Sequence, residues 1–231
     1  MISFLDRFFD LIAPRLCAVC GSRLTVSEKM ICAPCNRHLP RTDYALSPLD
    51  NPLCRIFWKQ VPIEKAAAWF YYSAKSPASR AIYDLKYHHR AAIGHYFGEM
   101  MACEMQANGF FEGIDLLIPV PLTKGRMRER GYNQSLLIAE GVAHITHIPV
   151  ENKALKRIRF DGSQTQQSIE LRRENVKDAF RLQHPERIIG RHLLLIDDVI
   201  TTGSTMLACS KELTKAGDIK VSVLSLGFVG R

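Results

Sequence analysis

Apolar residues recur along most of the chain with two alternating spacings. Short continuous apolar runs are typical of buried strands, whereas apolar residues three and four positions apart are typical of helices. Strands that alternate with helices form βαβ units. The sequence therefore predicts an α/β fold, a parallel sheet with helices on both faces, whose ligands bind at the carboxyl ends of the strands. The strand pattern covers residues 66–73, 114–122, 149–158, 192–199 and 220–229, and the helix pattern covers residues 78–87, 93–107, 134–147 and 204–216.

The first 62 residues follow a different pattern. Apolar residues in positions 4–12 have near-helical spacing, which predicts a short amphipathic helix docked on the protein's own surface. Residues 36–62 contain four prolines, which interrupt any long element. We therefore predict an N-terminal module and linker in residues 1–62 and the α/β domain in residues 63–231.

Composition and charge restrict the class of protein. Of 231 residues, 47% are apolar and 23% are charged, which is typical of a globular chain that folds throughout. No apolar run approaches the roughly 18 residues that a membrane span needs. Asp6, Arg7 and Asp10 interrupt the stretch where a signal peptide would be apolar, so we expect a cytoplasmic protein with no transmembrane segment. The net charge of +8 favours polyanionic ligands such as phosphates, pyrophosphates or nucleic acid, but does not choose among them.

Two adjacent acids, Asp197 and Asp198, end the apolar run that begins at His192. Two carboxylates would repel a phosphate unless they bind something cationic or rich in hydroxyls, and a Mg²⁺-chelated ribose offers both. Neither a Walker pattern nor GxGxxG is present. The alternative is that these acids and the hydroxyls after them only cap a helix, although capping needs one such residue.

A hydroxyl-rich segment follows the acids and precedes a predicted helix. Backbone N–H groups and hydroxyls at the start of a helix favour a bound anion. A glycine lets the backbone approach that anion closely. The predicted phosphate-binding residues are Thr201, Thr202, Gly203, Ser204 and Thr205.

The segment 193–206, LLLIDDVITTGSTM, resembles the signature of type I phosphoribosyltransferases. The resemblance implies that Asp197 and Asp198 hold the ribose 2′- and 3′-hydroxyls and that residues 201–205 hold the 5′-phosphate. The ligand it implies is phosphoribosyl pyrophosphate, bound with Mg²⁺. It also implies a type I phosphoribosyltransferase-like sheet for the main domain.

A second segment is strongly cationic. We predict a loop after the strand at 114–122 that faces the acids across a cleft and neutralises a leaving pyrophosphate. A solvated basic surface and a nucleic-acid patch are the alternatives. Its cations occupy alternate positions, and two glycines permit its bends: Lys124, Gly125, Arg126, Arg128, Arg130 and Gly131.

The combination of PVPL, the spaced arginines and RGYNQ resembles the ComF family, which includes a relative named for gluconate metabolism. The resemblance extends to residues 157–180, which correspond to a mobile loop of that family. Such a loop would act as a lid that excludes water. An amphipathic surface helix is the alternative for residues 170–177. The lid residues that correspond are Gln164, Thr165, Gln166, Arg172 and Asn175.

An LKY sequence at Leu85–Tyr87 completes the family pattern. Lys86 could reach a phosphate from this position. The alternative is that Lys86 only interacts favourably with the end of its own helix.

Four cysteines near the N-terminus form two CxxC pairs with an 11-residue spacer: Cys17, Cys20, Cys32 and Cys35. This spacing is typical of a structural Zn²⁺ site with four thiolate ligands. Two disulfides or a redox CxxC are the alternatives, but a reducing cytoplasm disfavours disulfides. A zinc ribbon joined to a phosphoribosyltransferase-like domain is also the ComF arrangement.

Two functions follow from these observations. The first is an enzyme that transfers the phosphoribosyl group to a nitrogen nucleophile and releases pyrophosphate. The second comes from the resemblance, which implies a link to natural transformation. In that case the protein handles single-stranded DNA, or acts as an adaptor for DNA-uptake proteins, without catalysis. The sequence does not predict the acceptor.

Overall fold

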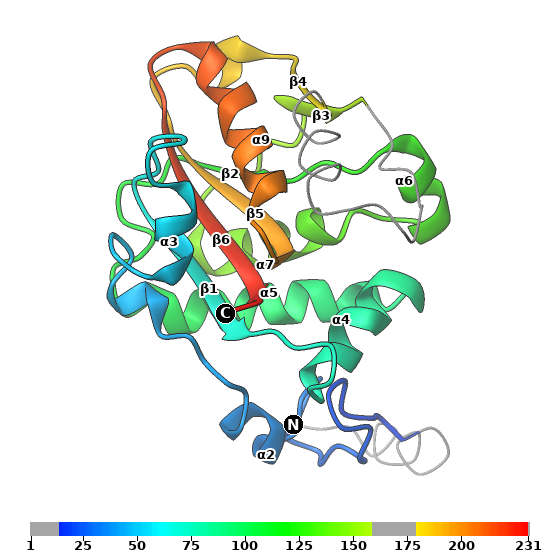
Figure 1. The fold of residues 1–231 in the computed structure, drawn as a ribbon. Coiled ribbons are helices and arrows are strands. Elements are labelled where there is room, and N and C mark those ends of the chain that lie inside the picture. The colour runs from blue at the N-terminus through cyan, green and yellow to red at the C-terminus, as the bar shows by residue number, and fades with distance from the viewer. Residues whose placement is uncertain (1–13, 159–178, 231) are drawn as a thin grey trace.

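The central sheet of the molecule is parallel throughout. The computed structural model describes residues 14–158 and 179–230. Within them, four parallel strands lie in the order β1-β6-β5-β2 (Figure 1). The predicted α/β class is therefore confirmed, and the carboxyl ends of these strands lie at one edge of the sheet. The strands are β1 Ala66–Tyr71, β2 Leu116–Pro119, β5 His192–Ile200 and β6 Lys220–Phe228.

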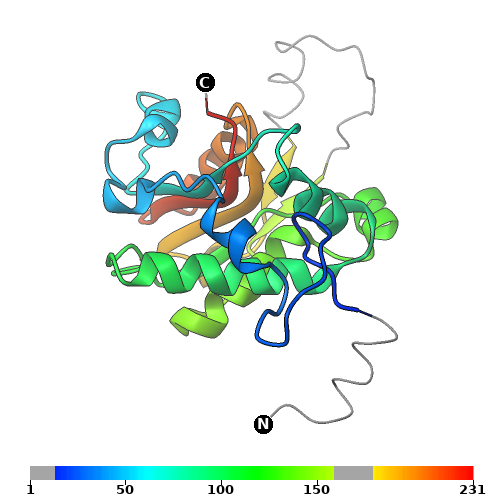
Figure 2. The same cartoon turned by 90° about the horizontal axis from the view of Figure 1, so that it is seen from below.

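Helices cover both faces of the sheet. α5 and α7 lie together on one face, where α7 packs on β2 and β5, while α9 packs on β5 from the other face (Figure 2). The longer helices are α4 Ala78–Tyr87, α5 Ala91–Gln106, α6 Lys124–Arg130, α7 Gln134–Thr146 and α9 Ser204–Leu213. The shorter segments are α2 Ala33–Arg37, η1 Tyr44–Leu46, α3 Pro52–Phe57, η2 Pro185–Arg187 and η3 Thr214–Ala216.

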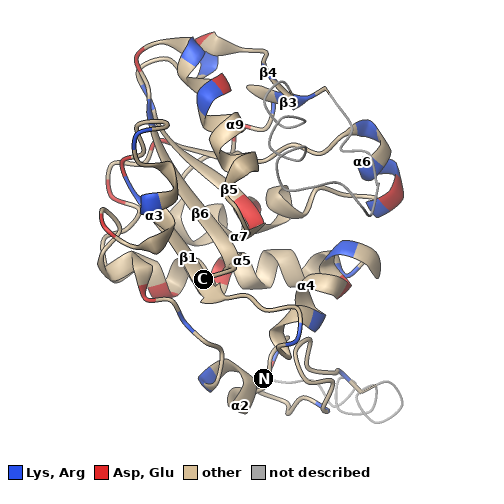
Figure 3. Ribbon diagram, viewed as in Figure 1, with Lys and Arg blue, Asp and Glu red and all other residues tan. Residues whose placement is uncertain are grey.

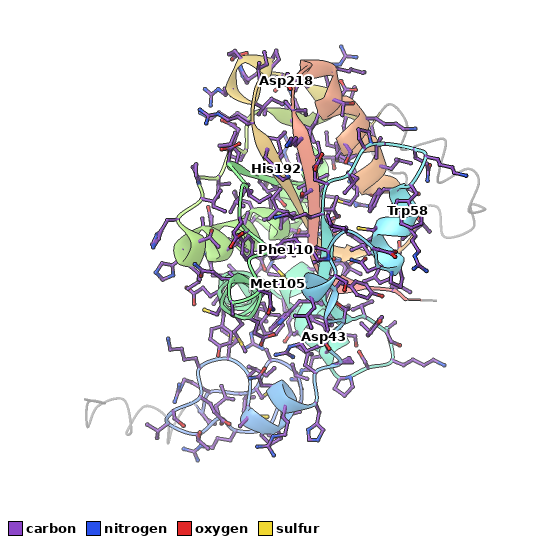
Figure 4. All side chains as sticks on the ribbon, turned by 90° about the vertical axis from the view of Figure 1, so that its left-hand side faces the viewer. Asp43, Trp58, Met105, Phe110, His192 and Asp218 are labelled. Atoms are coloured by element: carbon purple, nitrogen blue, oxygen red, sulfur yellow. The ribbon has the colours of Figure 1, made fainter. Side chains whose placement is uncertain are left out.

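The two central strands are buried on both faces, which explains their continuous apolar runs. The side chains from Leu193 to Ile196 in β5 are fully buried, and Leu195 pairs with Val223 of β6. Met105 and Phe110, labelled in Figure 4, close the core at the end of α5. Among the described residues, no helix is both long and apolar enough to cross a membrane.

The prediction that residues 149–158 form a strand of the main sheet is wrong. Val150 makes only an isolated parallel bridge with Leu117. The Glu151 carboxylate then accepts hydrogen bonds from the backbone N–H groups of Lys153 and Ala154, which turns the chain. Beyond this turn, β3 Leu155–Arg157 pairs antiparallel with β4 Phe180–Leu182 in a separate two-stranded sheet.

The linker contains a helix that the proline pattern did not predict. Asn51 caps α3 by accepting hydrogen bonds from the backbone N–H groups of Leu53 and Cys54. Pro52 occupies the first helical position, where its fixed φ favours the helix and its missing N–H costs nothing.

Two glycines allow α5 and α7 to cross in close contact. A Cβ atom on Gly98 would lie 2.3 Å from the carbonyl oxygen of Ile138. A Cβ atom on Gly141 would lie 2.2 Å from the carbonyl oxygen of His95. Both neighbours are backbone atoms, so the helices would have to separate to admit a side chain.

We therefore predict that Gly141→Ala lowers the free energy of unfolding by about 1–3 kcal/mol, the usual cost of overpacking. Chemical denaturation measures it. Glu140→Ala, which removes only a half-exposed ion pair with His95, serves as the control and should change stability by less than about 0.5 kcal/mol. An unchanged stability of the Gly141 variant would contradict the close crossing.

Candidate functional site

Two acids lie side by side at the carboxyl end of β5, and different elements hold them. Asp197 accepts hydrogen bonds from Ser135 Oγ of α7 at 2.9 Å and from the backbone N–H of Asp198 at 2.9 Å. Asp198 is buried, and its Oδ1 lies 3.0 Å from Lys86 Nζ of α4. Three elements that are distant in sequence therefore meet at these two carboxylates.

The electrostatics of the pair depend on burial and on Lys86. Desolvation and the adjacent Asp198 carboxylate raise the pKa of Asp197 to about 6. Burial lowers the pKa of Lys86, but the carboxylates of Asp198 and Asp197 together raise it by more, so its pKa lies above the ordinary value. Lys86 is therefore a cation that compensates the two acids near neutral pH.

The hydroxyl-rich segment and the first acid share one pocket, which is lined by Asp197 and residues 199–206. Thr201 and Thr202 are exposed at its rim, and the hydroxyl oxygens of Thr202 and Ser204 lie 2.8 Å apart. The chain then enters α9, whose first residue is Ser204.

Gly203 has a φ of +76° and is buried against the linker. A Cβ atom at this position would lie 2.6 Å from Cγ2 of Ile56 in α3. This support by α3 was not predicted from the sequence. The Asn51-Pro52 pair, a helix cap followed by proline, could have predicted the helix α3 but not its contact with Gly203.

The cationic segment is a helix, so the predicted loop at residues 124–130 is wrong. Thr123 caps α6 by accepting a hydrogen bond from the backbone N–H of Arg126, Gly125 lies inside the helix, and Gly131 ends it with a φ of +77°. Residues four apart share a face of a helix. Lys124 and Arg128 are accordingly exposed, while Arg126 and Arg130 are half-buried.

The four cations of α6 therefore lie on different faces of the helix and do not form one basic surface. Figure 3 shows the acidic end of β5 between basic segments of α6 and α4. Arg130 is the α6 residue whose charge acts on Lys86.

Arg130 also joins α6 to α7 and α4. Its Nη1 donates to Gln134 Oε1 at 3.0 Å, and its guanidinium carbon lies 5.4 Å from the centre of the Tyr87 ring. Within the described part of the chain, the buried Arg130 Nε and Gln134 Nε2 have no hydrogen-bond partner. Buried donors are normally paired, so these two are available to an acceptor at the site.

The RGYNQ sequence positions this corner of the molecule. Tyr132 Oη donates to the Leu85 carbonyl at 2.8 Å, and Asn133 Nδ2 donates to the Val120 carbonyl at 3.0 Å. The same Asn133 caps α7, because its side-chain oxygen accepts the backbone N–H of Ser135. These positioning contacts were not predicted from the sequence, although an Asn before a helix pattern is a capping signal.

The predicted lid, residues 157–180, falls almost entirely outside the part of the chain that the structure describes. Gln164, Thr165, Gln166, Arg172 and Asn175 lie outside the described residues.

The four N-terminal cysteines come together. Their sulfur atoms all lie within 4.8 Å of one another, and they are free thiols rather than disulfides. Cys20 Sγ and Cys32 Sγ are 3.7 Å apart, which matches the edge of about 3.8 Å that a tetrahedron with 2.3 Å metal–sulfur bonds requires. Cys17 Sγ also accepts a hydrogen bond from the Cys32 backbone N–H at 3.3 Å. The cluster could therefore hold a metal ion.

Helix α4 contacts both this cluster and the acids. Gly21, directly after the first cysteine pair, faces Arg80, since a Cβ atom there would lie 2.2 Å from Arg80 Nη1. At the other end of the helix, Lys86 reaches Asp198. One helix therefore connects the cysteine module to the pocket.

Comparison with known proteins defines the family, although no family model matches the chain. The DNA utilization protein YhgH of Escherichia coli O157:H7 is 32% identical over 227 residues, which cover 94% of this chain and 98% of that protein. Competence protein F of Haemophilus influenzae is 39% identical over 113 residues, covering 48% of this chain and 49% of that protein. The chain belongs to the ComF family. Competence protein ComFC of Bacillus subtilis is 30% identical over 102 residues, covering 44% of this chain and 39% of that protein.

Solved structures are more distant from this ComF-family chain. Adenine phosphoribosyltransferase from Leishmania tarentolae has a TM-score of 0.37 and 11% identity, covering 77% of this chain and 88% of that chain. Glutamine phosphoribosylpyrophosphate amidotransferase from B. subtilis has a TM-score of 0.38 and 24% identity, covering 58% of this chain and 26% of that chain.

The raised pKa of Asp197 predicts that the free energy of unfolding of this ComF-family protein depends on pH. Because the folded protein binds this proton more tightly than the unfolded chain, the carboxyl group destabilises the fold as the pH rises from about 4 through about 6. We expect Asp197→Asn to raise the free energy of unfolding at about pH 8 by on the order of 1–3 kcal/mol, and to have no effect near pH 4. Thermal denaturation across this range measures the difference.

Asp198→Asn serves as the contrasting variant. It should destabilise the protein at about pH 8, because it leaves the half-buried Lys86 without its nearest carboxylate. A stability gain for Asp197→Asn that does not depend on pH would contradict the assigned titration.

Proposed function

We propose that this ComF-family protein binds phosphoribosyl pyrophosphate with Mg²⁺ at the end of β5 and transfers its phosphoribosyl group, with release of pyrophosphate, in the handling of DNA. The observation that carries the proposal is the single pocket lined by Asp197 and residues 199–206. It joins an acid suited to ribose hydroxyls to a segment suited to a phosphate.

The start of α9 suits the 5′-phosphate. Helix N-termini favour anions through their free N–H groups and the helix dipole. The hydroxyls of Thr202 and Ser204 add donors there, and Gly203 adopts the positive φ of the turn that enters α9. Thr201 and Thr205 complete the proposed phosphate contacts.

The two acids suit a hydroxyl-rich, cation-bearing ligand. Carboxylate oxygens are the ligands that Mg²⁺ and ribose hydroxyls favour, so the residues present fit a Mg²⁺-bound ribose. Ser135 and Lys86 hold the acids in place before the ligand arrives.

The cations near the acids suit the pyrophosphate. Lys86 is protonated, and Arg130 and Gln134 each carry a buried donor with no partner among the described residues. During transfer, the bond between the ribose anomeric carbon and the pyrophosphate oxygen breaks, and a bond from that carbon to a nitrogen nucleophile forms. Mg²⁺ would supply additional charge for the leaving pyrophosphate. The residues of this chain orient the ribose and neutralise the departing anion.

The predicted lid, residues 157–180, remains part of the proposal. Its role would be to exclude water from the reacting carbon. Arg172 would bring a further positive charge.

The cysteine cluster is proposed to bind Zn²⁺ as a structural ion. Burial raises the pKa of Cys32 and Cys35, so these two thiols need a nearby cation to ionise, whereas hydrogen bonding with Ser22 lowers the pKa of Cys20 to about 6. Zn²⁺ favours four thiolates in a tetrahedron. The ion would fix the chain around Gly21 against Arg80 of α4.

Removal of both acids should abolish ligand binding. For Asp197→Asn with Asp198→Asn, we expect phosphoribosyl pyrophosphate with Mg²⁺ to bind roughly 100-fold more weakly or not at all, because two charged acceptors are lost. Isothermal titration calorimetry measures the affinity. The matched control, Asp43→Asn with Asp218→Asn, changes the net charge equally at residues outside the pocket (Figure 4). Equal affinity for both variants would refute the assignment.

Transfer is tested separately from binding. The zinc-loaded protein is incubated with phosphoribosyl pyrophosphate, Mg²⁺ and a panel of bases, amines and oligonucleotides while pyrophosphate is measured. Release that depends on one acceptor supports the enzyme. Intact binding without release for any acceptor favours the second candidate.

That second candidate is a DNA-handling or adaptor protein without catalysis. It is favoured by the names of the relatives, a DNA utilization protein that matches 94% of this chain and two competence proteins. The net charge of +8 fits a phosphate backbone as partner.

Zinc content tests the cysteine site. We expect about one zinc ion per chain by elemental analysis, and loss of the ion with a lower melting temperature for Cys17→Ser with Cys32→Ser. Cys103→Ser, which alters an exposed cysteine outside the cluster, should change neither. Zinc retained by the double variant would rule out this site.

A further inference from the structure

Helix α4 carries an exposed stripe with two tyrosines. Tyr83 and Tyr87 lie four residues apart and are 54% and 48% exposed. Their ring centres are 4.9 Å apart, with an angle of 45° between the planes. An aromatic pair at this spacing stabilises a helix by only about 0.2–0.5 kcal/mol. These rings therefore contribute little to the core, and large faces of them remain open to a partner.

Positive charge lies along the same helix. Arg80 precedes Tyr83 by one helical turn and belongs to the same face. The guanidinium of Arg130 lies 5.4 Å from the Tyr87 ring centre. Figure 3 shows basic segments at both ends of α4. An occupant of this stripe should thus combine flat apolar groups with negative charge.

The stripe also lies between two features already described. Arg80 contacts the chain at Gly21 beside the cysteine cluster, and Lys86 contacts Asp198 at the pocket. Tyr83 lies between these two contacts in the helix and Tyr87 directly follows Lys86, and the two tyrosines are about 6 Å apart along the helix axis. A chain-like ligand on the stripe would extend from the cysteine module toward the pocket.

We propose that Tyr83 and Tyr87 form a stacking platform for the unpaired bases of single-stranded DNA, with Arg80 and Arg130 near its phosphates. This inference rests on the proposed role of the protein in DNA handling. Aromatic side chains stack on bases of any sequence, while arginines follow the charged backbone. A duplex does not offer its base faces, so the platform selects single strands.

The test measures binding of a fluorescent oligothymidylate of about 12 nucleotides by anisotropy at about 50 mM salt. We expect Tyr83→Ala with Tyr87→Ala to weaken binding about tenfold or more, because each stacked base contributes roughly 1–3 kcal/mol. Tyr83→Phe with Tyr87→Phe keeps both rings and should bind within about twofold of the original protein. A duplex of the same length should bind more weakly, and the alanine variant should not change its affinity.

The matched control is Trp58→Ala, which removes another exposed ring, 52% exposed, that follows α3 (Figure 4). It should leave oligonucleotide affinity unchanged. The salt dependence of binding provides a second readout. Arg80→Ala should reduce the slope of log affinity against log salt concentration by roughly 1, and the tyrosine variants should not change that slope. Unaltered affinity in the double alanine variant, or an equal loss in the Trp58 variant, would overturn the platform.

Failure of the platform can be separated from failure of the pocket. Tyr83→Ala should leave the calorimetric affinity for phosphoribosyl pyrophosphate with Mg²⁺ unchanged. If the original protein binds this ligand but no oligonucleotide, the platform is refuted and the pocket assignment stands. If it binds oligonucleotides through the tyrosines but not phosphoribosyl pyrophosphate, the pocket assignment fails and the platform stands.

Discussion

The contact between Lys86 and the acids at the end of β5 is the interaction on which the rest of the site depends. Two adjacent carboxylates at the end of a buried strand are costly, because each loses water and repels the other. Lys86 offsets that cost from α4, and Ser135 offsets it from α7. Because both partners come from distant segments, the acids can remain charged only when these helices are docked correctly.

The docking of those helices explains the polar side chains around them. Tyr132 fastens the start of α7 to the end of α4, and Asn133 both caps α7 and binds the chain after β2. Just after the end of α4, His88 and Arg90 both pair with the buried Asp84 of that helix. The polar groups of this corner thus hold a charged site in one geometry, which a purely apolar packing would not specify.

Much of this arrangement follows from the sequence. Local patterns determined the main strands and helices, since continuous apolar runs and residues three or four apart reflect burial directly. The end of the run at Asp197 placed the acids at the edge of the sheet, and the cysteine spacing anticipated the cluster that the structure contains. These are features in which the chemistry lies close together in the chain.

The predictions failed where distant contacts or single caps decide the structure. Alternate cations suggested a loop at residues 124–130, but Thr123 and Gly131 delimit a helix there, so only part of the charge faces inward. The Glu151 turn removed the third strand from the sheet. Neither the reach of Lys86 to Asp198 nor the support of Gly203 by α3 has a local signature, because each joins segments more than a hundred residues apart.

The contact at Gly203 has an evolutionary consequence. With no room for a side chain between Ile56 and this backbone, the linker and the segment after β5 cannot vary independently, and substitutions at the two positions should appear together among relatives.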